Sequence, residues 1–322
     1  MGKHERQLIE EAEKIVEKIL NSRSLGAGDK RNPWFNHAVC AAKQIKKDFP
    51  NISSTKHLGN RYDNTGDILI ISNGKKIFIE IKMSDTKSGV GTKANISQDA
   101  LTENCLFVGK MKSWSDFRKE KNHNKWVDDY LSKFNRYPQK ISKIGNSAIQ
   151  REEKARYLRN LKRNKKSKII LKDISERDRS EKLEYLNYLS AQKQDGETIK
   201  RFFILILLGI HTKEILFELI KEKNFFEEVQ NLFVYYANYH KDKIIIRKED
   251  AGDRVSKILN RYSNFKIIFP DGLSHCKIAG AKGDKSEPLL QIVFHWKNVA
   301  QGIKTPCLNI FDLTTNIKRN WE

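Results

Sequence analysis

The chain has 322 residues and carries 61 Lys and Arg against 40 Asp and Glu, which gives a formal net charge of +21. Its 39% hydrophobic and 10% aromatic content excludes a disordered polybasic tail, because such tails lack the apolar residues that build a core. A net charge of +21 on a folded protein predicts a polyanionic partner. Nucleic acid is the first candidate and an anionic membrane surface is the second.

The apolar runs do not predict a membrane protein. The most apolar run, 202–210, has nine residues, whereas a spanning helix needs about 20. Acidic residues interrupt the apolar pattern of the N-terminus, which is not typical of a secretory signal. The four cysteines lie far apart, which indicates reduced thiols rather than a zinc cluster. These features predict a soluble, cytoplasmic protein.

Two helices and a hairpin are expected in the first third of the chain. Residues 8–19 place apolar side chains at three- and four-residue spacing, which predicts an amphipathic helix. Asn32 as N-cap and Pro33 as first helical residue predict a second helix that stops before Pro50. In 67–82, two apolar β-branched runs flank Asn73-Gly74, a sequence typical of a two-residue type I′ turn.

A strongly basic stretch occupies 110–168. It has 19 Lys and Arg against 6 Asp and Glu and therefore holds +13 of the total charge. A solvated helical face is the alternative, but we expect this stretch to contact nucleic acid. The residues expected to do so are Lys112, Arg118, Lys119, Arg151, Arg156, Arg159, Lys162 and Arg163.

Beyond residue 196 the chain becomes apolar again. A helical pattern runs from 199 to about 233, and strand-like runs occur at 243–247, 265–269, 289–296 and 307–311. Another short strand is expected at 105–108. The Asp195-Gly196 turn signal marks a candidate boundary.

The hairpin brings together residues that carry chemistry. With a two-residue loop at Asn73-Gly74, Ile70 faces Ile77, Leu69 faces Phe78, and Asp67 faces Glu80. Period-two alternation places Lys82 on the same face as Glu80. Because opposed carboxylates repel each other, we expect a hard divalent cation such as Mg²⁺ to offset the repulsion. The alternative is structural: Asp67 caps a strand and Glu80 pairs with Lys82 or Lys76.

Asp67, separated by twelve residues from Glu80-Ile81-Lys82, resembles the PD-(D/E)xK motif of the restriction-endonuclease-like nuclease superfamily. Gly66 stands in place of the proline, and 88–102 resembles the segment on the C-terminal side of the motif in some type II restriction enzymes. The resemblance covers about 60–110. It implies an α/β fold in which a mixed β-sheet core is flanked by helices, with a basic helical region and an α+β C-terminal part added here.

The same resemblance implies Mg²⁺-dependent phosphodiester hydrolysis, with Mn²⁺ as a substitute ion. Asp67, Glu80 and the main-chain carbonyl of Ile81 would hold the metal, and Lys82 would position or activate the attacking water. Such enzymes often recruit another acid from an N-terminal helix, for which Glu5 and Glu13 are the candidates.

Four further residues are candidates for the active site. Gly89, Gly91 and Lys93 lie in a loop whose glycines permit close approach to a phosphate, although an ordinary flexible connection is an equal alternative. Gln98, expected one turn into the next helix, is the fourth, because in parts of the superfamily a polar residue there faces the active site.

Together these observations predict a type II restriction endonuclease that cleaves double-stranded DNA as a homodimer. A cognate DNA methyltransferase is expected in the same cell, without a stable complex. The expected parts are an endonuclease core at 1–110, a basic helical DNA-binding region at 111–196, and a C-terminal α+β part for recognition and dimerisation at 197–322. The alternatives are a repair or structure-specific nuclease and a catalytically silent DNA-binding protein.

Overall fold

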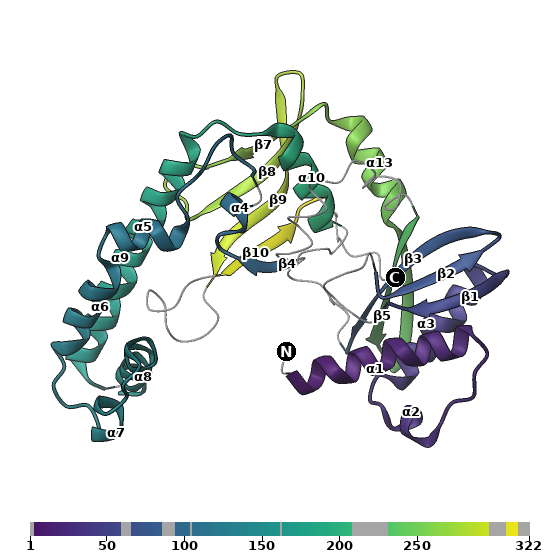
Figure 1. Cartoon of the computed structure of the whole chain (residues 1–322), viewed down its shortest axis with the longest axis horizontal. Helices are drawn as coiled ribbons and strands as arrows, with labels where there is room; N and C mark the ends of the chain where they lie inside the picture. Colours follow the sequence, from purple (N-terminus) through teal and green to yellow (C-terminus); the bar gives the residue numbers. More distant parts are fainter. Residues whose placement is uncertain are drawn as a thin grey trace. The chain divides into compact units, whose positions relative to one another are not determined.

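The computed structural model describes residues 3–58, 66–85, 94–103, 105–161, 163–207, 231–295 and 307–314. The chain forms two compact units (Figure 1). The first comprises Met1–Gly91 and Ile204–Tyr262, and the second comprises Thr92–Phe203 and Ser263–Glu322. Each is built around its own five-stranded sheet with helices beside it, so the expected α/β class is confirmed.

A mixed sheet forms the centre of the first unit. Its strands are β1 (Ile52–His57), β2 (Ile68–Ser72), β3 (Lys75–Ser84), β5 (Leu232–His240) and β6 (Lys243–Asp250), in the order β1-β2-β3-β5-β6. Only the β3–β5 pair of this sheet is parallel. Because β5 and β6 belong to this sheet, residues 204–262 return to the unit formed by the N-terminal part, whereas residues 263–322 belong to the second unit. The structure therefore divides the chain differently from the three consecutive parts expected from the sequence.

Helices pack on the first sheet through apolar residues. α1 (Lys3–Leu20) and α3 (Phe35–Asp48) bury Ala12, Ile15, Ala38 and Ile45 against Ile68, Ile70, Ile77, Ile79 and Ile81 of the hairpin. The unit also contains α2 (Ala27–Arg31) and α13 (Ala251–Arg261), and α10 (Gly196–Leu207) spans the boundary between the units. One face of the β2–β3 hairpin is therefore buried in the core against α1 and α3.

The second unit contains an antiparallel sheet. Its strands are β4 (Ala94–Ser97), β10 (Cys307–Asp312), β9 (Lys285–His295), β8 (His275–Lys282) and β7 (Asn264–Ile268), in that order. The helices of this unit are α4 (Ala100–Glu103), α5 (Trp114–Glu120), α6 (His123–Ser132), α7 (Gln139–Ser142), α8 (Ser147–Asn160) and α9 (Lys165–Ser190). Trp114 of α5 is fully buried and packs on Tyr185 of α9 and Phe294 of β9, which joins the helices to the sheet.

Several observed boundaries differ from the expected ones. The second helix begins at Phe35 with Trp34 as N-cap, because the Asn32 side chain instead accepts a hydrogen bond from the Trp34 N–H at 2.8 Å within the preceding turn. The helical pattern expected up to residue 233 is wrong at its end, where Leu232 begins β5. Of the strand expected at 105–108, only a single bridge between Phe107 and Gln194 forms.

The remaining strand predictions in the C-terminal third are confirmed. β6, β7, β9 and β10 overlap the expected runs. In the part of the chain that the structure describes, no helix combines the length and the apolar character needed to cross a membrane.

Candidate active site

The hairpin has the register that the sequence predicts. Ile70 pairs with Ile77 and Leu69 pairs with Phe78, and both turn residues, Asn73 and Gly74, have positive φ angles of 51° and 75°. Alternation along β3 then places Glu80 and Lys82 on the face opposite to the buried Ile79 and Ile81.

Asp67 lies one residue beyond the last pair of this ladder, Ile68–Ile79. Its N–H donates to the carbonyl oxygen of Ile79 at 2.8 Å, and its Oδ2 accepts a hydrogen bond from the Ile81 N–H at 2.7 Å. The expected one-to-one opposition of Asp67 and Glu80 is thus replaced by a tighter arrangement in which the Asp67 carboxylate folds over the β3 backbone. Its other oxygen, Oδ1, takes no part in these bonds.

The conformation of Gly66 excludes proline at this position. Gly66 has φ +87°, and a Cβ atom there would lie 3.0 Å from the carbonyl oxygen of Ile79. Proline, whose ring fixes φ near −65°, could not adopt this conformation. The glycine therefore allows the backbone of β3 to approach and orients Asp67.

Glu80 and Lys82 form an ion pair at the same end of the hairpin. The Glu80 side chain is 14% exposed, whereas that of Lys82 is 47% exposed. The carboxylate is therefore largely enclosed, and the ammonium group is accessible to a substrate.

Glu13 of α1 adds a third acid to this region. It is buried, and its Oε2 lies 3.3 Å from Nε2 of His57 on β1. Its charge acts on both Asp67 and Lys82. Of the two acids considered from the sequence, the structure brings Glu13 to the hairpin, whereas the side chain of Glu5 lies outside the described residues.

The clustered acids perturb the ionisation of Asp67. Burial raises the pKa of Asp67 well above its usual value, and the negative charges of Glu80 and Glu13 raise it further. Lys82 and the Ile81 N–H act in the opposite direction but do not compensate. The site therefore carries more negative charge than its own lysine neutralises.

The pKa of Lys82 is raised as well, which favours its charged form. Desolvation lowers the pKa of Lys82, but Glu80, Asp67 and Glu13 outweigh it and raise the pKa above its ordinary value. Nearly half of the Lys82 side chain is accessible to solvent, so its desolvation is incomplete. The attraction of the three carboxylates therefore decides that its pKa is raised. In the metal-free protein Lys82 is accordingly a protonated cation at neutral pH.

The donors at this site suit a hard cation. Mg²⁺ is commonly held by one or two carboxylates with waters and substrate phosphate completing its shell. Asp67 and Glu80 supply carboxylate oxygens, and the unneutralised negative charge favours a cation between them. Across the described residues, no group of three or more His, Cys, Asp or Glu is arranged to hold a metal.

The place of the other expected active-site residues relative to the hairpin stays a prediction. Gly89, Gly91 and Lys93 lie outside the described residues. Gln98 belongs to the second unit, between β4 and α4 rather than inside a helix, and its side chain is buried and donates to Asp99 Oδ2 at 3.0 Å.

The basic residues of the second unit divide into two groups. Arg118 and Arg151 are about nine-tenths buried, and Arg151 makes two hydrogen bonds of 2.8 and 2.9 Å to Asp128, so neither is a freely exposed contact for DNA. The exposed residues are Lys112, Lys119, Arg156, Arg159 and Arg163, whereas Lys162 lies outside the described residues. Exposure thus suits five members of the expected DNA-contacting set, and DNA contact by any member stays a prediction.

Sequence reasoning missed His57. It lies in a polar segment with no motif around it, and only the packing of α1 on β1 brings it to Glu13.

Comparisons with known proteins gave no match. No family model, no curated protein and no solved structure is significantly similar to this chain.

Proposed function

We propose that the protein is a Mg²⁺-dependent endonuclease that hydrolyses phosphodiester bonds in double-stranded DNA. The observation that carries the proposal is the convergence of Asp67, Glu80 and Lys82 at one end of the β2–β3 hairpin. An excess of negative charge at that point supports it, because a buried acid with a raised pKa needs a functional or structural reason.

In this proposal Asp67, Glu80 and the main-chain carbonyl of Ile81 would hold the metal. When bound, the ion supplies Lewis-acid stabilisation of the negative charge on the scissile phosphate. Lys82 orients the attacking water and stabilises charge on the phosphate through its ammonium group. Its raised pKa favours this electrostatic role over that of a general base.

Glu13 completes the arrangement from α1. Its carboxylate, held by His57, helps to keep Lys82 protonated. Exposed basic residues on α5, α8 and the turn before α9 supply phosphate contacts that position the duplex without reading its sequence.

A type II restriction enzyme that acts as a homodimer is the form of nuclease that we favour. A mixed sheet flanked by helices is the core that the motif implies, and the large second unit offers elements beyond the catalytic hairpin for contacts with base edges. A repair or structure-specific nuclease shares the same hairpin chemistry. A catalytically silent DNA-binding protein gains nothing from two acids and a lysine that converge.

The experiment is incubation of plasmid and phage DNA with the purified chain in Mg²⁺ or in EDTA. Discrete fragments in Mg²⁺ alone support restriction, and a smear supports a less specific nuclease. DNA that is bound but never cleaved in Mg²⁺ or Mn²⁺ would favour the silent DNA-binding protein.

A further inference from the structure

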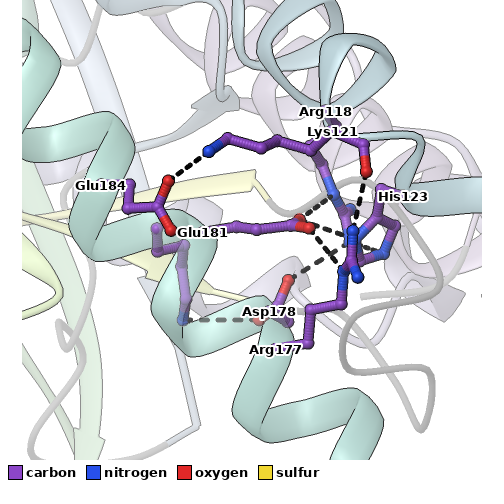
Figure 2. Close-up of polar contacts among 8 residues, drawn as sticks. Arg118, Lys121, His123, Arg177, Asp178, Glu181 and Glu184 are labelled. Carbon is purple, nitrogen blue, oxygen red and sulfur yellow. Dashed lines mark hydrogen bonds and ion pairs between the residues drawn. The ribbon is translucent and has the colours of Figure 1, made fainter. Parts of the chain in front are cut away.

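A cluster of charged side chains is buried where α5, α6 and α9 meet in the second unit (Figure 2). Its members are Arg118 from α5, His123 from α6, and Arg177, Asp178, Glu181 and Lys182 from α9. His123, Asp178, Glu181 and Lys182 are at most 5% exposed. Charges removed from water to this extent are costly unless each has partners.

Glu181 is the centre of the cluster. Its Oε2 lies 2.6 Å from His123 Nδ1 and 3.4 Å from Arg118 Nε, and its Oε1 accepts from Arg177 Nε at 2.8 Å. Asp178 lies 3.5 Å from Arg118 Nη2 and 3.8 Å from Lys182 Nζ. The side chains of α9 thereby hold Arg118 in one position, as Figure 2 shows.

Cations and carboxylates contact one another throughout this cluster. Arg118, Arg177 and Lys182 pair with the carboxylates of Asp178 and Glu181. Burial lowers the pKa of Lys182 to about 8. Burial lowers the pKa of Arg118 even though both carboxylates oppose the effect. The contacts with Asp178 and Glu181 thus hold a guanidinium group in place beneath the surface.

A pocket of about 390 Å³ opens directly over Arg118 and His123. It is lined mainly by Arg118, Lys119, Asn122, His123, Asn124 and Lys125, and none of its described lining residues is an Asp or Glu. Lys119 and Lys125 are exposed, and Lys119 is only loosely held, at 3.3 Å from Asp116. A buried guanidinium beneath a basic, acid-free pocket has the chemistry that recognises phosphate.

We propose that this pocket binds a phosphate group, with Arg118 as the buried anchor and Lys119 and Lys125 at the rim. The phosphate belongs either to the backbone of a nucleic acid or to a free phosphate compound, and the two sources share the same chemistry. Phosphate binding here does not depend on cleavage, because every residue of the pocket belongs to the second unit.

The test uses the full chain and a substitution that adds charge without changing shape. Asn124→Asp places a carboxylate in the pocket, and an acid in the first turn of α6 is favourable to the helix, so folding is retained. Asn187→Asp is the matched control, since Asn187 is exposed on α9 and does not line the pocket. The probes are inorganic phosphate, followed by thermal shift and calorimetry, and a labelled DNA duplex, followed by fluorescence anisotropy at several salt concentrations.

The expected result is that phosphate binds the wild type and Asn187→Asp alike and binds Asn124→Asp at least about tenfold more weakly. If the source is a nucleic-acid backbone, Asn124→Asp also weakens duplex binding relative to the control and reduces the salt slope by about 1. If the source is a free phosphate compound, duplex binding by the two variants is equal. The proposal is overturned if both variants bind phosphate and duplex with the same affinity. Loss of cleavage by an active-site variant bears only on the endonuclease proposal.

Discussion

The Glu181→Gln substitution is a direct test of how the second unit is held together. The change keeps the shape of the side chain but removes the charge that holds Arg118, His123 and Arg177. Glu181 is 4% exposed, so its partners would be left buried with one carboxylate fewer. Removing one partner from a buried ion network costs about 3–5 kcal/mol, and we expect a loss of that size in the free energy of unfolding at pH 7.

Glu184→Gln on the same helix is the matched control. Its carboxylate is 48% exposed and lies 2.5 Å from Lys121 Nζ, and exposed pairs contribute about 0–1 kcal/mol. Urea denaturation monitored by circular dichroism measures both variants. A Glu181→Gln variant within about 1 kcal/mol of Glu184→Gln would refute the reasoning.

The difference in stability between the wild type and Glu181→Gln should depend on pH. The pKa of Glu181 is lowered: burial raises it, but hydrogen bonds and charge from His123, Arg177 and Arg118 outweigh that effect. A lowered pKa in the folded state stabilises the protein above the ordinary value of 4.5, and the contribution is lost as the pH falls through the folded pKa. The difference between wild type and Glu181→Gln should therefore shrink in acid.

Three further outcomes are expected. Asp67→Asn relieves repulsion among the carboxylates at the hairpin and keeps an oxygen that accepts from the Ile81 N–H. It should raise the free energy of unfolding of the metal-free protein at pH 7 by about 1 kcal/mol, measured by urea titration. A loss of stability would contradict an excess of negative charge at the hairpin. Gly74→Ala should cost about 1 kcal/mol for its positive φ alone. Gly66→Ala should destabilise the protein clearly more, because its Cβ would also clash with the Ile79 backbone. Thermal unfolding compares the two variants, and equal losses would count against the close approach of the Ile79 backbone to residue 66. Burial raises the pKa of Asp178 to about 6. Protonation of Asp178 therefore stabilises the folded state fully below the ordinary pKa of 3.8, and this contribution is lost as the pH rises through about 6. An NMR titration of this carboxyl with its midpoint near 3.8 would be inconsistent with its burial.

Local signals predicted local structure well. The Asn73-Gly74 turn set the hairpin register, and the three- and four-residue spacing of 8–19 set the first helix. The expected helix ran about two residues into β5, and the rest of β5 was not predicted, because an apolar run has no periodicity that separates a buried strand from a buried helix. β8 went unrecognised because its Ala279, Gly280 and Ala281 have low strand propensity, and only pairing with β9 holds them extended.

The candidate active site was predictable to the extent that it is local. One hairpin carries Asp67, Glu80 and Lys82, so the pairing register set by the two-residue turn is enough to place them together. Glu13 could be suspected on the edge of α1, but His57 depends on how α1 packs on β1. The buried cluster around Glu181 was beyond reach, because the residues that pair there, Arg118 and Asp178, are 60 positions apart in the chain. For the same reason a basic stretch that was expected to be exposed contains two buried arginines.

Whether Lys82 acts at a metal-dependent catalytic site is tested most directly by the rate of Mg²⁺-dependent DNA cleavage by Lys82→Ala. Lys76→Ala is the control, since Lys76 is an exposed lysine on the same strand, beside the turn. We expect Lys82→Ala to lose cleavage by a factor of about 100 or more while binding the duplex and unfolding as the wild type does. Lys76→Ala should cleave normally. Cleavage by Lys82→Ala at the rate of Lys76→Ala would contradict a catalytic role for Lys82.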